Sequence, residues 1–78
     1  MFPQILPRLK ILLATEAIRL NPQYADAYYN RGNSYFNLKK YDLAIADAQQ
    51  AANLFQQQGD TENYQKTLSL IEDIEELK

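Results

Sequence analysis

The stretch that decides the fold runs from Ala25 to Leu54: ADAYYNRGNSYFN over residues 25–37, LKK over 38–40 and YDLAIADAQQAANL over 41–54. Apolar and small residues recur three and four positions apart in its first and last parts. Each part therefore predicts a helix with one inward face. We expect helices near residues 24–38 and 41–57, folded into a tight hairpin. The inward residues are Ala25, Tyr28, Gly32 and Tyr35 in the first helix, and Ala44, Ala48, Ala51 and Phe55 in the second.

Gly32 indicates how close the two helices come. A glycine in the middle of a helix costs about 1 kcal/mol relative to alanine, so its presence favours a close contact over a surface role. The opposing inward residues, Ala44 and Ala48, are also small. We expect the two backbones to lie close together, with Tyr28 and Tyr35 filling the space beside them.

The hairpin resembles a tetratricopeptide repeat of the bacterial type that carries the sequence YYNRG. The resemblance covers roughly residues 14 to 55, because residues 14–22 are similar to the end of a preceding repeat, including its closing Pro22. The family usually has a large side chain at the position of Ala48 and a proline at that of Gln56. Loss of that proline fits the last full repeat of an array. The matching residues are Tyr28, Gly32, Tyr35, Tyr41, Ala44 and Ala51.

Two further helices flank the hairpin. The first is expected from about Pro7 to Leu20, and the last over about 61–77, after Gly59 and a capping Asp60. The last helix carries an apolar stripe of Tyr64, Leu68, Ile71 and Ile74, with Leu70 and Leu77 on its flank. Its other face, with Glu62, Lys66, Glu72, Asp73 and Glu76, is expected to be solvated.

The sequence therefore predicts an all-α chain, a helix-turn-helix repeat with a C-terminal capping helix. We divide it into residues 1–22, which resemble the end of a preceding repeat, the hairpin 23–57 and the capping segment 58–78. Because terminal helices of a repeat array meet water on one side, the charged outer face of the last helix suits a cap.

Composition excludes several classes of function. The 78 residues hold eight basic and ten acidic side chains, a net charge of −2, which gives no electrostatic footprint for nucleic acid or an anionic membrane. With no cysteine and no histidine, the chain lacks thiolate metal ligands and the usual general base. We expect no enzyme activity, no cofactor and no metal site. No apolar run reaches the roughly 20 residues that cross a bilayer, and we expect a cytoplasmic protein.

A polar face of the first hairpin helix is the predicted binding site. In tetratricopeptide repeats the corresponding face lines a groove for an extended peptide or a partner helix, so the resemblance implies a protein or peptide partner. A competing interpretation packs Tyr29 and Phe36 on the N-terminal helix of the same chain. The predicted partner-binding residues are Asp26, Tyr29, Asn30, Asn33, Phe36 and Asn37.

The N-terminal helix is predicted to drive self-association. The first helix of its own repeat is missing from the sequence, so its apolar side chains lack the partner that the repeat pattern provides. We expect a two-fold homodimer, formed by stacking or exchanging these helices, as a structural alternative to partner binding. A monomer with this helix folded over Tyr29 and Phe36 is the other possibility. The predicted self-association residues are Leu9, Leu12, Leu13 and Ile18, with Phe2, Ile5 and Leu6 adding apolar area.

Overall fold

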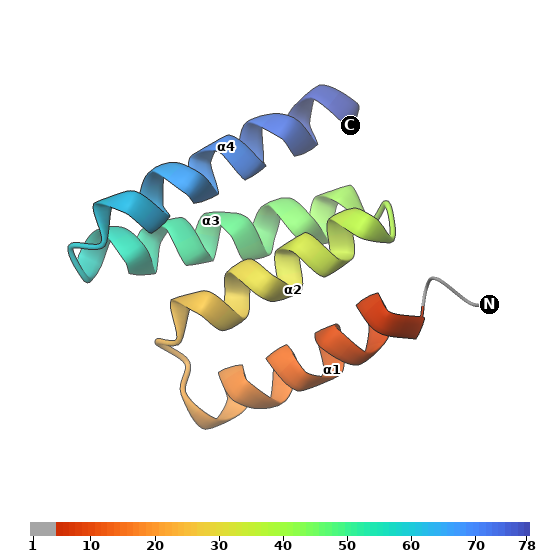
Figure 1. Cartoon of the computed structure of the whole chain (residues 1–78), viewed down its shortest axis with the longest axis horizontal. Helices are drawn as coiled ribbons and strands as arrows, with labels where there is room; N and C mark the ends of the chain where they lie inside the picture. Colours follow the sequence, from red (N-terminus) through yellow and green to blue (C-terminus); the bar gives the residue numbers. More distant parts are fainter. Residues whose placement is uncertain (1–4) are drawn as a thin grey trace.

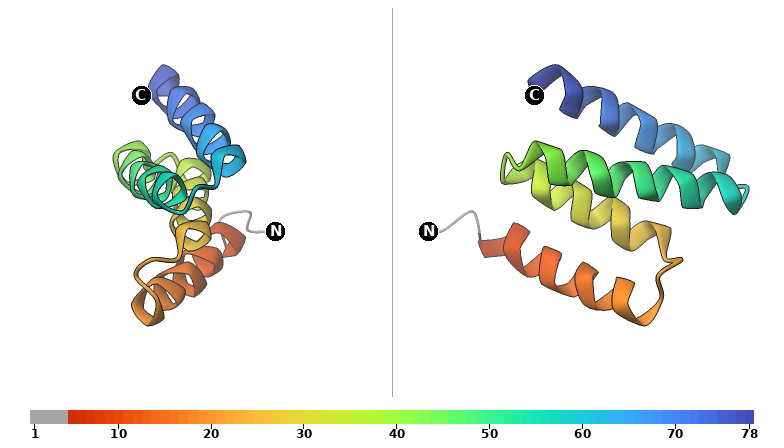
Figure 2. Two further views of the ribbon diagram at one scale, coloured as in Figure 1. Left: turned by 90° about the vertical axis from the view of Figure 1, so that its left-hand side faces the viewer. Right: turned by 180° about the vertical axis from the view of Figure 1, so that it is seen from behind.

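The computed structural model describes residues 5–78, and all of its regular secondary structure is helical. Successive helices run antiparallel and stack side by side, with α1 and α4 at opposite ends (Figure 1). Two further views show the same stack and its twist (Figure 2). The predicted all-α fold is therefore confirmed. The helices are α1 (Ile5–Leu20), α2 (Ala25–Asn37), α3 (Tyr41–Gln57) and α4 (Thr61–Leu77).

The predicted helix ranges agree with these bounds except at the start of α1. The structure includes Ile5 and Leu6 in α1, ahead of Pro7. Pro7 then lies in the first turn, where its missing N–H breaks no helical hydrogen bond. Phe2, which was expected to add apolar area, lies outside the described residues.

Two turns between helices contain a residue with a positive φ angle, and the second turn ends in a helix cap. Lys39, between α2 and α3, has a φ of 62°, and Gly59, between α3 and α4, has a φ of 75°. Asp60 caps α4 as predicted, because its Oδ1 accepts a hydrogen bond of 3.2 Å from the backbone N–H of Asn63. The short turns hold α2, α3 and α4 as antiparallel neighbours.

The contact between α2 and α3 is centred on Gly32. A Cβ atom at this position would lie 3.1 Å from the carbonyl oxygen of Ala44 and 3.3 Å from the backbone nitrogen of Ala48. Both alanines have no exposed surface. The predicted close approach of the two backbones is confirmed.

The buried face of α4 differs from the predicted stripe. Thr67, Leu70 and Ile74 are buried, whereas Leu77, expected beside them, is 60% exposed. Tyr64, Leu68 and Ile71 are only half-buried. α4 is therefore rotated about its own axis relative to the predicted orientation, because Leu70 and Ile74 pack on Ala44 and Ala48 of α3. Thr67 tolerates full burial since its hydroxyl donates a 2.7 Å hydrogen bond to the carbonyl oxygen of Asn63.

The packing around Ala48 explains why this position has a small residue where the repeat pattern usually has a large one. It belongs to the cluster that Leu70 and Ile74 complete, and the half-buried Tyr29 and Phe36 pack against the same cluster. A large side chain at position 48 would fill the space that these residues of α2 and α4 occupy. The small residue therefore lets α4 pack close to the hairpin.

Candidate functional site

The six predicted partner-binding residues divide into two groups. Asp26, Asn30, Asn33 and Asn37 are exposed along α2. The three asparagines follow at spacings of three and four residues, so they share one face. The asparagine side chains make no hydrogen bond to another described residue. Within residues 5–78, the hydrogen-bonding groups of these amides are therefore unpaired.

Tyr29 and Phe36 form the second group, and they are neither fully exposed nor fully buried. Both pack against the core cluster that α3 and α4 form, and Tyr29 also packs against the cluster around Ala51 and Phe55. The Phe36 ring lies 6.0 Å from that of Tyr41, and the Nζ of Lys66 in α4 lies 5.2 Å from the Tyr29 ring centroid. The aromatic pair is thus largely a structural contact between α2 and the helices that follow it.

The exposed amides face a hollow between α1 and α2, which we call the α1–α2 hollow. It has a volume of about 400 Å³ and combines the amides with a lysine and small and apolar side chains. Its lining residues are Lys10, Leu13, Ala14 and Ala17 of α1, Tyr24 before α2, and Ala27, Asn30, Asn33, Ser34 and Asn37 of α2.

A second hollow of about 300 Å³ lies between α2 and α4. Asp26 and Tyr29 line it from α2, and Asn63 and Lys66 line it from α4. Asn30 lines both hollows. The α2 face is therefore bordered by a recess on each side.

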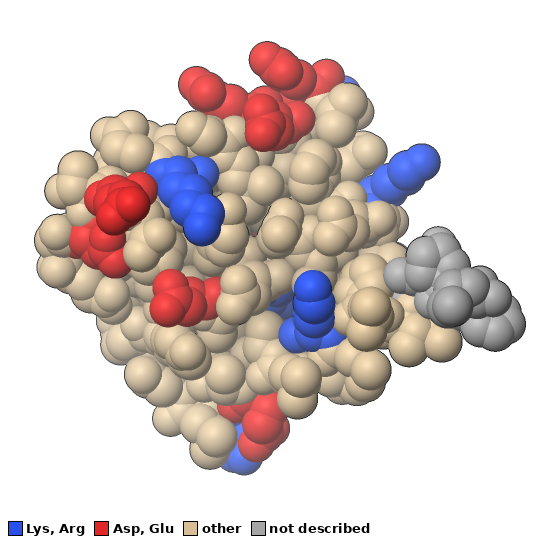
Figure 3. Space-filling view, in the orientation of Figure 1, with Lys and Arg blue, Asp and Glu red and all other residues tan. Residues whose placement is uncertain are grey.

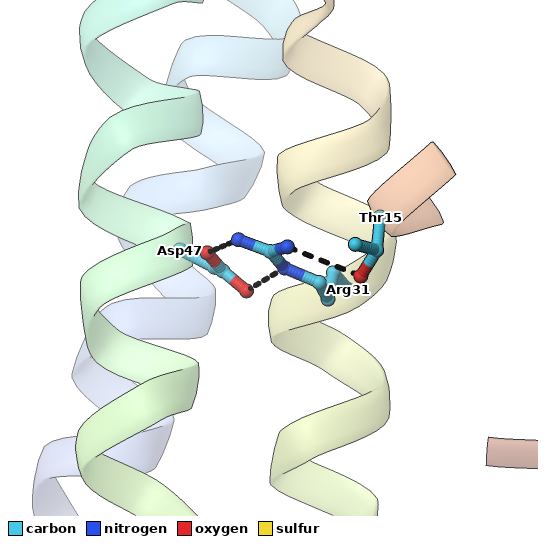
Figure 4. A network of polar contacts seen from close by, with 3 residues as sticks. All are labelled: Thr15, Arg31 and Asp47. Atoms are coloured by element: carbon cyan, nitrogen blue, oxygen red, sulfur yellow. Dashed lines mark hydrogen bonds and ion pairs between the residues drawn. The ribbon is translucent and has the colours of Figure 1, made fainter. Parts of the chain in front are cut away.

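An ion pair behind this face joins α2 to α3, and a hydrogen bond from the same arginine reaches α1 (Figure 4). Arg31 of α2 donates from Nε and Nη2 to the two carboxylate oxygens of Asp47 in α3, at 2.7 and 2.9 Å. Its Nη1 donates to the hydroxyl of Thr15 in α1 at 3.2 Å. The hydrogen bonds with Asp47 raise the pKa of the Arg31 guanidinium above its ordinary value, so the guanidinium stays charged.

This ion pair was not predicted from the sequence, although the sequence pattern contained a signal for it. Asp47 lies between Ala44 and Ala48 on the inward face of α3, and Arg31 directly precedes Gly32. A charged side chain at an inward position needs a partner, because burying an unpaired charge is costly. From the sequence, that requirement could have identified Arg31 as the partner of Asp47.

The predicted self-association residues lie on α1, and three of the four are open to solvent. Leu9, Leu12 and Leu13 are 49%, 66% and 71% exposed, whereas Ile18 is half-buried. Ile5 and Leu6 are also exposed. Within residues 5–78, this end of the stack therefore leaves a large part of its apolar surface uncovered.

Two other features, a metal site and a membrane-spanning helix, are not found in residues 5–78. This part of the chain brings together no group of three or more Asp, Glu, His or Cys residues that could hold a metal ion. None of the described helices is both long enough and apolar enough to cross a membrane.

An antiparallel helical hairpin closed by small residues, with a neighbouring helix on each side, defines a helical repeat of the α-α class. The sequence model of the tetratricopeptide repeat family matches residues 25–58, which comprise α2, α3 and the turn between them. The chain thus contains a tetratricopeptide repeat, and such repeats generally mediate protein–protein interactions. Searches of curated proteins and of solved structures give no significant match.

Proposed function

We propose that this chain binds a peptide or a helix of a partner protein through the face of α2 that carries Asp26, Tyr29, Asn30, Asn33, Phe36 and Asn37. The observation that carries the proposal is the row of three exposed amides along the α1–α2 hollow. An amide side chain offers both donors and an acceptor, which suits the alternating N–H and C=O groups of a peptide backbone. The apolar Leu13 and Ala17 opposite would contact the partner's side chains.

Removal of two amides should weaken binding without unfolding the chain. Peptides selected from a random library on the immobilised chain serve as probes, and their Kd is measured by fluorescence polarisation. Because each hydrogen bond contributes about 1 kcal/mol, we expect the variant Asn33→Ala/Asn37→Ala to bind about tenfold or more weakly. Its melting temperature should stay within a few degrees of the original because both residues are exposed.

Asn53→Ala is the matched control, since Asn53 is an exposed asparagine on α3 outside the two hollows described above. This control should bind as the unmodified chain does. Equal Kd values for all three proteins would contradict the proposed site. Tyr29 and Phe36 are poor probes, because their contacts with the core make a loss of stability difficult to separate from a loss of binding.

A structural homodimer is the second candidate function, and the exposed apolar side chains of α1 favour it. A two-fold contact would bury Leu9, Leu12 and Leu13 against the same residues of another copy. We expect Leu12→Asp to shift such a dimer towards a 9.1-kDa species in sedimentation equilibrium. Leu43→Asp is the control, because Leu43 is a half-exposed leucine on α3. A single 9.1-kDa species at micromolar concentration, unaffected by Leu12→Asp, would rule the two-fold dimer out.

A further inference from the structure

The α1–α2 hollow has the position of a helix-binding site within the repeat. Pro22 and Gln56 occupy the same repeat position, so a residue of α1 corresponds to the residue of α3 that follows it by 34 positions, the length of the matched repeat. The four residues by which α1 lines the hollow, Lys10, Leu13, Ala14 and Ala17, then correspond to Ala44, Asp47, Ala48 and Ala51.

Those four residues of α3 hold α2. Atoms of Ala44, Asp47 and Ala48 come closest to a Cβ atom placed on Gly32, and Ala51 belongs to the cluster against which Tyr28 packs. The hollow is therefore the place where α1 would receive a helix in the way that α3 receives α2.

α4 has the pattern of the helix that this position would take. It begins 36 residues after α2, so Tyr64, Leu68 and Ile71 correspond to Tyr28, Gly32 and Tyr35. These three residues of α4 are half-buried: Tyr64 and Ile71 pack against the core clusters of the same chain, and part of each side chain stays accessible. α4 thus leaves accessible part of the face that corresponds to the one with which α2 meets α3.

We propose that α4 of a second copy of this chain docks into the α1–α2 hollow, antiparallel to α1, and joins the copies head to tail. The inference rests on the proposed function, since it takes the α2 face as a binding surface and names the partner helix. Together, α4 of one copy and α1 of the next would complete a repeat.

Charge favours this pair of helices. α1 carries three basic residues and one acidic residue, whereas α4 carries five acidic residues and one basic residue. Figure 3 shows acidic side chains gathered along the upper edge of the molecule, over α4. Antiparallel docking would bring the basic N-terminal half of α1 to the acidic C-terminal half of α4.

One specific ion pair follows from the correspondence. Phe36 packs against the cluster that contains Ala44. Glu72 is the α4 counterpart of Phe36, and Lys10 is the α1 counterpart of Ala44. Both side chains are exposed in the single chain. We therefore expect Glu72 of one copy to pair with Lys10 of the next.

The side chains at the proposed contact between α1 and α4 are larger than those between α2 and α3, so the two helix axes would lie farther apart. Leu68 replaces Gly32, and Leu13 replaces Asp47, so the two backbones could not approach as closely as they do at Gly32. Leu13 already lines the hollow, whose volume of about 400 Å³ is the space that the Leu68 side chain would enter.

Head-to-tail docking differs in symmetry from the two-fold dimer. Each contact leaves one hollow and one α4 free at the ends of the assembly, so the assembly keeps growing as the concentration rises. Sedimentation equilibrium of the 78-residue chain at low salt should give a weight-average mass that exceeds twice 9.1 kDa at the highest concentrations. The mass should fall as salt screens the ion pair.

Charge reversal tests the pair directly. We expect Lys10→Glu and Glu72→Lys each to lower the mass towards 9.1 kDa, and an equimolar mixture of the two variants to recover it. In the mixture one contact keeps the original pair and the other carries the reversed pair. Lys40→Glu is the control for Lys10→Glu, because it replaces an exposed lysine before α3 with the same change of net charge, and it should leave the mass unchanged.

Leu12→Asp separates the two kinds of assembly, because Leu12 does not line the hollow. Head-to-tail docking should tolerate this variant, whereas the two-fold dimer should not. A mass that stops at twice 9.1 kDa, a monomer at all concentrations, or a mixture that fails to recover the mass would overturn the inference. None of these results would alter the peptide measurement on Asn33 and Asn37, which tests the proposed function separately.

Discussion

Gly32→Leu should unfold the protein or leave it close to unfolding. A Cβ atom alone would lie 3.1 Å from the Ala44 carbonyl oxygen and 3.2 Å from the Asp47 Cβ, so the rest of a leucine side chain has no space. Overpacking of this kind costs about 1–3 kcal/mol, and more where backbone atoms have to move. Since small domains have unfolding free energies of about 5 kcal/mol or somewhat more, we expect most of the stability to be lost.

Thermal unfolding followed by circular dichroism measures this effect. Ala46→Leu is the matched control, because it adds a similar side chain at an exposed position of α3 and should leave the melting temperature nearly unchanged. If Gly32→Leu melted at the same temperature as the unmodified chain, the two backbones could not be as close as the structure shows.

Asp47→Ala should produce the second large loss of stability. The Asp47 side chain is only 9% exposed and that of Arg31 is 21% exposed, so the substitution leaves a mostly buried guanidinium with the Thr15 hydroxyl and the Tyr28 ring as its remaining partners. Breaking a buried ion pair on one side costs about 3–5 kcal/mol. Because water reaches part of Arg31, we expect a loss of about 2–3 kcal/mol in the unfolding free energy.

Urea denaturation of four proteins separates the cost of an unpaired charge from the contribution of the pair. The double variant Arg31→Met/Asp47→Leu should recover much of the stability, since no charge is left buried without a partner. Thr15→Val removes only the exposed hydrogen bond and should change the unfolding free energy by about 0.5 kcal/mol or less. A double variant as unstable as Asp47→Ala would show that the ion pair itself stabilises the fold.

The fold was largely predictable because it depends on local patterns. Residues three and four positions apart define the helix faces, and Gly32 indicates the close contact of α2 with α3. The rotation of α4 was not predictable, because both Leu68 and Leu70 are apolar and only the packing on Ala48 decides which is buried.

The candidate site was predictable only in part, for the same reason. The amides at Asn30, Asn33 and Asn37 follow from helical periodicity, and the structure finds them exposed. The placement of Tyr29 and Phe36 depends on where α4 lies, which no local pattern in α2 encodes. The α1–α2 hollow likewise requires the positions of two helices relative to each other.

Because α1 has few buried contacts with the rest of the chain, binding in the α1–α2 hollow should affect the local unfolding of α1. Among residues 5–20, Ala14 alone is buried, and Thr15 provides the hydrogen bond between an α1 side chain and α2. Helices with few buried contacts open at a lower free energy than the core, so the amides of α1 should exchange with solvent deuterium before those of α3. A helix that fills the hollow covers α1 as well as α2, so its binding free energy also holds α1 closed. Slower amide exchange in α1 would therefore report occupancy of the hollow, even for a ligand that leaves the rest of the chain unchanged.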